Sequence, residues 1–148
     1  MAEESVAPEF WVGVDEFNQR QYYACHDTLE AIWIEALEPQ RTLYQGILQM
    51  AVALYHLGNG NWRGAVILLG EGMNRLRRID AGLANIDLDL LLEEGSYLMQ
   101  ALQQTGPEDA IALWQYLTGE PMDEERVHAL MEKTVLPSLP LIRQRTES

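Results

Sequence analysis

Two strongly apolar segments on either side of a Gly/Asn cluster are the feature that most restricts the fold of this chain. The segment "LYQGILQMAVALYHLGNGNWRGAVILL", residues 43–69, carries apolar residues at steps of three and four on both sides of Gly58, Asn59 and Gly60. This period is typical of α-helices, and a cluster of glycine and asparagine ends one helix before the next begins. The sequence therefore predicts a hairpin of two helices, the first of which has few polar positions and should be deeply buried.

Small residues in this hairpin suggest how its helices meet. Gly46, Ala53, Gly64 and Ala65 would permit close approach, as in one tetratricopeptide-like hairpin. The pattern is not repeated elsewhere in the chain at the period of about 34 residues that an array would need. We therefore expect one such hairpin inside a compact bundle, and not a solenoid.

The rest of the chain also has the periodicity of helices. Asp15, Asn61 and Asp87 are suitable N-caps, while Pro39 and Pro107 suit helix starts. No segment alternates apolar and polar residues in the way that a strand requires. We predict an all-α fold of about five or six helices, over residues 15–37, 39–58, 61–79, 87–106, 107–119 and 122–133.

Length and composition predict one domain. The chain has 148 residues, 47% of them hydrophobic, which is enough for one continuous core over residues 1–148. Within it we distinguish a core at about 15–80, an acidic helical half at 81–135 and a proline-broken, extended tail at 136–148. The apolar "PEFWVGV", with Trp11, precedes the first predicted helix. We expect it to form an arm that covers the bundle or docks on a second subunit.

Charge and cysteine content narrow the functional classes. The formal net charge of −13 disfavours binding to nucleic acid or to an anionic membrane surface. The longest apolar stretch is shorter than the roughly 20 residues of a membrane-spanning helix. Cys25 is the one cysteine, and "MAEESVAPEF" does not resemble a signal peptide, so we expect a cytoplasmic protein.

The candidate site lies where the first two predicted helices meet. His26 and Glu30 are four residues apart, so both lie on one side of a helix, at the edge of its apolar stripe. Gln45, Gln49 and His56 fall on one narrow stripe of the next helix. If the two helices pair in antiparallel fashion, these groups would form a buried polar seam and satisfy one another.

Two other interpretations of these residues stay open. His26, Glu30 and His56 would form a two-histidine, one-carboxylate metal site suitable for zinc or iron, although the third ligand is a weak candidate. A catalytic interpretation takes Glu30 as a base or His26 as a proton shuttle, but the sequence shows no nucleophile to accompany them. Cys25 fits a small buried side chain better than a reactive thiol. No cofactor is expected.

The segment "FNQRQYYACHDTLEAIW", residues 17–33, and the hairpin together resemble a bacterial and archaeal family, the family of domain of unknown function 309. The resemblance covers about residues 17–69, and its first motif is His, three residues, Glu, two residues, Trp. In the family an acidic residue, often Glu, follows the histidine. Here that residue is Asp27, which is a mild departure. The resemblance implies a small helical bundle and no established activity. Residues that match its two motifs are His26, Glu30 and Trp33, then Gln45, Gly46, Gln49, Ala51, Tyr55, His56, Asn61, Gly64 and Ala65.

These observations favour a non-enzymatic interaction domain that binds a protein partner or itself, with a homodimer as one form. The alternative is a small-molecule or metal site, with hydrolysis as one activity it could carry, built on His26, Glu30 and the polar residues of the second helix. The candidate ligand-binding or seam residues are His26, Glu30, Trp33, Gln45, Gln49, Tyr55, His56 and Asn61.

Overall fold

Helices account for nearly all of the regular structure in the computed structural model of the chain, which describes residues 5–145. Within those residues the only β-type pairing is an isolated bridge between Ile86 and Gln144, so the prediction of an all-α bundle is confirmed. The described part has seven α-helices, one more than the largest number expected. They are α1 (Glu9–Asn18), α2 (Tyr22–Trp33), α3 (Gln40–Gly58), α4 (Trp62–Leu76), α5 (Leu88–Thr105), α6 (Ala110–Leu117) and α7 (Glu124–Lys133), with short 3-10 helices at Leu83–Asn85 and Pro107–Asp109.

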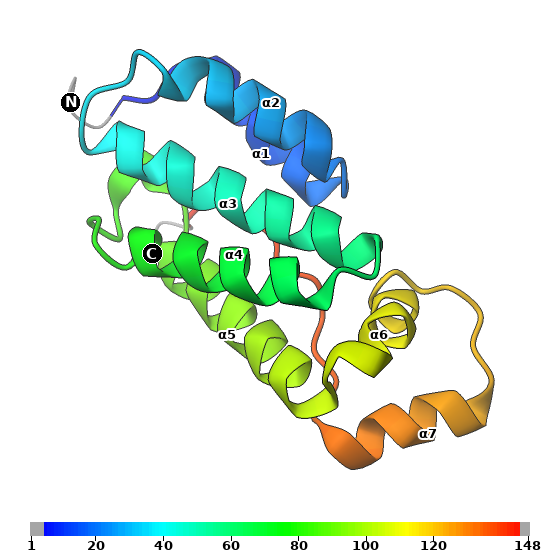
Figure 1. Cartoon of the computed structure of the whole chain (residues 1–148). Coiled ribbons are helices and arrows are strands. Elements are labelled where there is room, and N and C mark those ends of the chain that lie inside the picture. Colours follow the sequence, from blue (N-terminus) through cyan, green and yellow to red (C-terminus); the bar gives the residue numbers. More distant parts are fainter. Residues whose placement is uncertain (1–4, 146–148) are drawn as a thin grey trace.

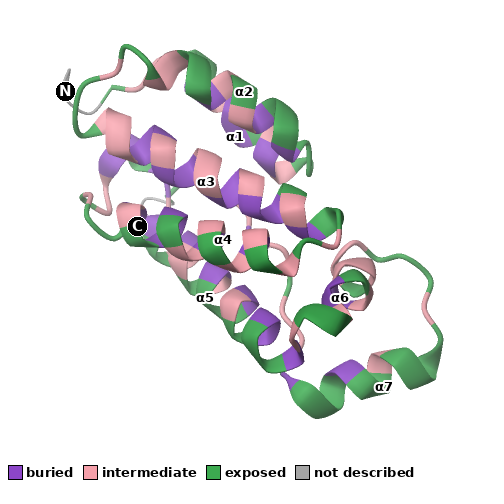
Figure 2. Ribbon diagram, viewed as in Figure 1, coloured by how far each residue is buried: buried purple, intermediate pink, exposed green. Residues whose placement is uncertain are grey.

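Successive helices pack side by side. The α1–α2 hairpin lies on α3, α3 lies against α4, and α4 lies against α5, while α6 and α7 cover one end of the body (Figure 1). The central helix α3 contributes more buried residues than any other helix (Figure 2). In the described part of the chain, no helix combines the length and the apolar character needed to cross a bilayer.

Glycines allow the backbones of α3 and α4 to approach closely. A Cβ atom built on Gly72 would lie 2.7 Å from the backbone oxygen of Gly46, which is closer than real atoms approach. Gly64 also meets α3 closely, because its Cβ would lie 2.9 Å from the His56 ring. The hairpin prediction identified Gly46 and Gly64, but Gly72 was not among its small residues.

The prediction of one helix over residues 15–37 is wrong. The chain breaks between Asn18 and Tyr22, where Arg20 adopts a left-handed conformation with φ 65°. The Gln21 amide donates to the Glu16 carbonyl at 2.8 Å. This turn contains no glycine or proline, so the apolar period runs through it and conceals the helix end.

The segment with Trp11 is therefore not an arm before the first helix. Glu9 begins α1, and Asp15 lies inside that helix and does not cap it. Phe10 is fully buried, and the half-buried Trp11 ring meets the Phe10 ring edge-on at 5.1 Å between centroids. The segment is apolar because it packs into the bundle as α1.

The segment after α7 runs in an extended conformation back along the bundle. Asn18 at the end of α1 donates to the Ile142 carbonyl and accepts from the Ile142 amide, both at 2.8 Å. The Glu94 carboxylate of α5 accepts from the Leu141 amide at 3.0 Å and from the Arg143 guanidinium at 2.9 Å. This segment is thus tied to both the first and the fifth helix.

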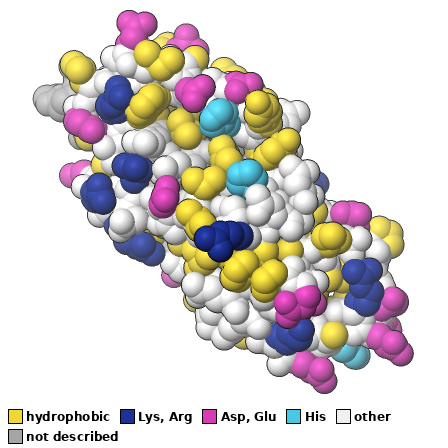
Figure 3. Space-filling view, in the orientation of Figure 1, with side chains coloured by type: hydrophobic (Ala, Val, Ile, Leu, Met, Phe, Trp, Pro, Cys, Tyr) yellow, Lys and Arg dark blue, Asp and Glu magenta, His cyan; other side chains and the backbone are white. Residues whose placement is uncertain are grey.

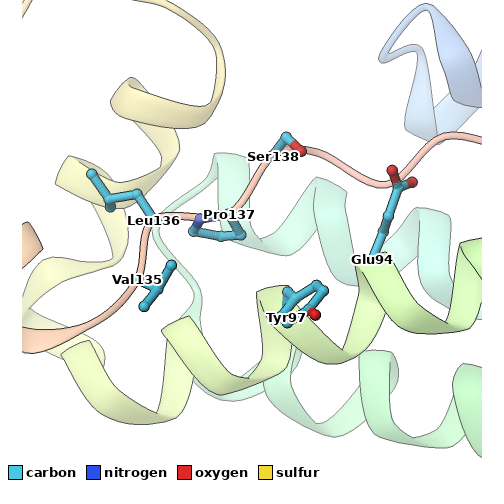
Figure 4. A pocket seen from close by; sticks show the side chains of 6 residues that line it. All are labelled: Glu94, Tyr97, Val135, Leu136, Pro137 and Ser138. Carbon is cyan, nitrogen blue, oxygen red and sulfur yellow. The ribbon is translucent and has the colours of Figure 1, made fainter.

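A pocket of about 350 Å³ lies between α5 and the same segment. Figure 4 shows Glu94 and Tyr97 on α5 and the other four lining residues, 135–138, on the extended chain. Because Glu94 already bonds to Leu141 and Arg143, its carboxylate serves to hold the chain in place.

Candidate functional site

Four rings from α2 and α3 form a continuous contact on one face of the molecule. The rings of Tyr23 and His26 stack at 5.9 Å with 8° between their planes, and those of Tyr23 and Tyr55 stack at 5.3 Å. The Tyr55 and His56 rings follow at 6.2 Å, tilted by 55°. We call Tyr23, His26, Tyr55 and His56 the aromatic ladder. It joins the start of α2 to the end of α3, because the two helices run in opposite directions.

The ladder is open to solvent. Tyr23 is 55% exposed and Tyr55 is 43% exposed. Figure 3 shows two histidine side chains near the middle of the face, among hydrophobic side chains. Because these exposed rings are contiguous, they form a candidate contact surface.

The predicted burial of the polar seam is wrong. His26 Nε2 lies 3.6 Å from Glu30 Oε2, and His26 Nδ1 lies 3.3 Å from Asp27 Oδ1, but the side chains of Glu30 and Asp27 are 54% and 66% exposed. Within the described residues, apart from tyrosines and Cys25, the buried polar side chains are those of Thr105 and Thr134. Apolar residues of α2 and α3 fill the contact between these helices and leave the polar stripe at its rim.

His56 is held over the start of α4. Asn61 caps α4 by accepting a hydrogen bond from the Gly64 amide at 3.0 Å, as the sequence predicts. The Asn61 amide nitrogen lies 3.4 Å from His56 Nδ1. Since Gly64 has no Cβ, the imidazole can lie directly on the first turn of α4. The turn between α3 and α4 thus fixes one end of the ladder.

Gln49 faces α4 and not His26. Gln49 Oε1 accepts a hydrogen bond from Arg75 Nε at 2.9 Å, and Gln49 Nε2 donates to Glu71 Oε1 at 3.4 Å. Gln49 therefore belongs to the α3–α4 contact and is separate from the ladder. Gln45, one turn earlier on α3, is half-buried.

Trp33 has a role at the end of α2. The Arg41 guanidinium lies 4.0 Å from the centre of the Trp33 ring, and Arg41 Nη1 donates to the carbonyls of Trp33 and Ile34 at 3.1 and 3.4 Å. A cation at this position stabilises the negative end of the helix. Trp33 Nε1 is buried without a hydrogen-bond partner.

The metal candidates do not come together. Among residues 5–145 no group of three His, Cys, Asp or Glu side chains is placed to hold a metal ion, so the set of His26, Glu30 and His56 is not assembled. Cys25 is fully buried, and desolvation raises the pKa of its thiol to about 12. Its packing suits a small apolar side chain.

Sequence reasoning missed Tyr23, the residue in the middle of the ladder. Tyr23 is three residues before His26, so both lie on one side of α2. The signal was present in the steps Tyr23, His26, Glu30, which follow the helical period along an exposed stripe. It was hidden because the neighbouring Tyr22 belongs to the apolar stripe and is buried.

The comparisons with known proteins apply to the helices that carry the ladder. Residues 10–68 match the family described as Domain of unknown function (DUF309). The uncharacterized protein YpuF of Bacillus subtilis (strain 168) is 35% identical over 71 residues, which are 47% of this chain and 41% of YpuF. The matched part of the chain thus spans less than half of that relative's length. No solved structure matches the chain. The resemblance found in the sequence is confirmed: residues 10–68, from α1 into α4, match the model of this family.

Proposed function

We propose that this chain is a protein-interaction domain whose contact surface is centred on the aromatic ladder. The observation that carries the proposal is the stack of Tyr23 and Tyr55, held across two helices while both rings stay about half exposed. Tyrosine is enriched among the residues that dominate binding energy at protein interfaces. Because the rings already pack on one another, a partner would find them ordered, and less conformational entropy would be lost on binding.

The charge of this surface favours a basic partner. Asp27 and Glu30 stand beside His26 at the edge of the ladder, and the whole chain carries −13. Opposite charges on the partner would accelerate encounter and help to fix its orientation. Two copies of this chain would repel one another, so we favour a different protein over a second copy. The proposal gives the ladder a binding role and no catalytic one.

Site-specific photo-cross-linking in cells of the source organism tests this proposal. A benzophenone amino acid would replace Tyr23 in one variant and Tyr97 in the other, which is a matched control because both tyrosines are 55% exposed. We expect a discrete cross-linked product from position 23 that position 97 does not give. Adding Tyr55→Ala, or Glu30→Lys, should reduce its yield.

The same experiment can contradict the proposal. If positions 23 and 97 give the same products, or position 23 gives none, the ladder is not a contact surface. A product with the mass of two copies would show that the partner at the ladder is a second copy of this chain and not a different protein.

A further inference from the structure

A second surface lies at the other end of the α2–α3 pair. A groove of about 450 Å³ runs between the last turns of α2 and the first turns of α3. Its apolar lining includes Ala31, Ile32, Ala36 and Leu37. This volume is within the range of ligand pockets, about 300–1,000 Å³. The ladder lies at the start of α2, so the two surfaces are separate.

The groove is lined by an unusually exposed aliphatic side chain. Leu37 is 81% exposed, and Ile34, three residues earlier in the segment that leaves α2, is 63% exposed. Exposed large side chains next to an apolar hollow are typical of a site that an apolar side chain of a partner fills. Together they describe a small anchor site.

The one charged side chain among the described lining residues of the groove is acidic. Glu35 lines it, and Glu9 is close enough to Tyr44, another lining residue, to contribute to the raised pKa of that phenol, although burial is the larger cause. No lysine or arginine is among the described residues that line it. The nearby Arg41 donates to carbonyls at the end of α2. Figure 3 shows hydrophobic, acidic and basic side chains over this end of the helix pair.

We propose that this groove binds a partner segment in which one aliphatic side chain is flanked by arginine or lysine. The aliphatic side chain would occupy the apolar lining, and the flanking cations would meet Glu35 and the negative field of the chain. The assignment rests on charge complementarity around an apolar hollow. It does not depend on the ladder, so either surface can hold if the other fails.

Fluorescence anisotropy with synthetic peptides tests the proposal on the full chain. The probe is a labelled nine-residue peptide with a central leucine flanked by arginines, and its controls replace the leucine with serine or the arginines with glutamate. We expect the serine control to bind about tenfold more weakly, because a leucine side chain would be lost from the groove. We expect no measurable binding of the glutamate control.

Paired variants separate this groove from general attraction to an acidic protein. Glu35→Lys and Glu132→Lys change the net charge equally, but only Glu35 lines the groove, and Glu132 lies on α7. We expect Glu35→Lys to weaken binding about fivefold and Glu132→Lys less than about twofold.

A second pair of variants tests the effect of filling the groove without changing the charge of the protein. Ala31→Trp would occupy it, whereas Ala24→Trp places the same side chain two turns away on an exposed position of α2. We expect only Ala31→Trp to weaken binding, and Tyr55→Ala in the ladder to leave it unchanged. Circular dichroism melts establish that each variant is folded. Equal behaviour within either pair, or equal binding of the leucine and serine peptides, would overturn the proposal.

Discussion

The turn after α1 and the turn after α3 have the same backbone structure and different residues at the decisive position. At the end of α3, the Gly60 amide donates to the Leu57 carbonyl at 3.0 Å and the Asn61 amide donates to the His56 carbonyl at 2.8 Å. Gly60 has φ 76°. This pair of hydrogen bonds around a left-handed residue is the Schellman motif.

The end of α1 repeats this pattern with Arg20 in the place of the glycine. The Arg20 amide donates to Phe17 at 3.1 Å and the Gln21 amide donates to Glu16 at 2.8 Å, with Arg20 at φ 65°. A left-handed conformation costs a residue with a Cβ about 1–2 kcal/mol. The comparison teaches that hydrogen bonding and packing can end a helix where the local sequence does not favour an end.

The two hairpins also differ in how their helices touch. A Cβ on Gly13 of α1 would lie 2.7 Å from Leu29 Cδ2, the end of a flexible side chain. A Cβ on Gly72 of α4 would lie at the same distance from the backbone oxygen of Gly46. A side chain can change rotamer, but a helix backbone can move only with the whole helix. Substitutions should therefore affect the two hairpins unequally.

The largest effect is expected for Gly72→Ala. The added methyl group would push α4 away from α3, and we expect the free energy of unfolding to fall by about 3 kcal/mol, at the upper end of overpacking costs. Urea denaturation followed by circular dichroism measures this change. A loss below about 1 kcal/mol would mean that the α3–α4 contact adapts easily, and the contrast between the hairpins would then disappear.

Gly60→Ala should have the next largest effect. The alanine would have to adopt the left-handed conformation, and its Cβ would lie 3.3 Å from Ile111 of α6. We expect a loss of about 1–2 kcal/mol of stability in the same assay. A neutral result would show that this turn does not require glycine.

Gly13→Ala should cost less, about 1 kcal/mol, because Leu29 can move aside and alanine favours the helix more than glycine does. The matched measurement is the difference between Gly13→Ala and Gly72→Ala under identical conditions. If Gly13→Ala proves the more damaging of the two, the assignment of the tighter contact to α3 and α4 is wrong.

Arg20→Gly should stabilise the protein by up to about 1 kcal/mol, since glycine adopts the left-handed conformation without steric cost. The Arg20 guanidinium also donates to the Thr118 carbonyl at 3.2 Å, and losing that exposed bond offsets part of the gain. Arg20→Ala, which loses the same bond and keeps the Cβ, is the control. A melting temperature for Arg20→Gly no higher than that of Arg20→Ala would argue against the strain.

The smallest effect concerns pH. Because burial raises the pKa of the Cys25 thiol from 9.0 to about 12, the thiolate is favoured in the unfolded chain, and stability falls as pH rises from 9 toward 12. At pH 9 the expected loss from this thiol is about 0.4 kcal/mol relative to pH 7. Urea titrations at pH 7, 8 and 9 measure it. Cys25→Ala should have a flatter profile, and an unchanged slope would show that Cys25 does not contribute.

The parts of the fold that follow from the sequence are those with a local chemical marker. Gly60, the N-cap residues Asn61 and Asp87, and the apolar period of α3 each predict a feature found in the structure. The break at Arg20 has no such marker, and the predicted first helix therefore began inside α1 and ran on through α2.

The candidate site also has features that the local sequence predicts and features that it does not. Spacing predicted that His26 and Glu30 share one side of a helix, because that depends on the helix alone. Whether that side of the helix faces the core depends on how α2 is rotated about its own axis relative to α3. The apolar residues of both helices together determine this rotation. Tyr23 meets Tyr55 only through that pairing, so no local pattern could have shown the stack.

The bond between Asn18 and Ile142 joins residues 124 positions apart in the chain. When a ribosome has just synthesised α1 to α4, the residue that bonds to the end of the first helix is still unmade. The nascent bundle must therefore wait with the side that later receives Ile142 still exposed, and it closes only when that late segment emerges.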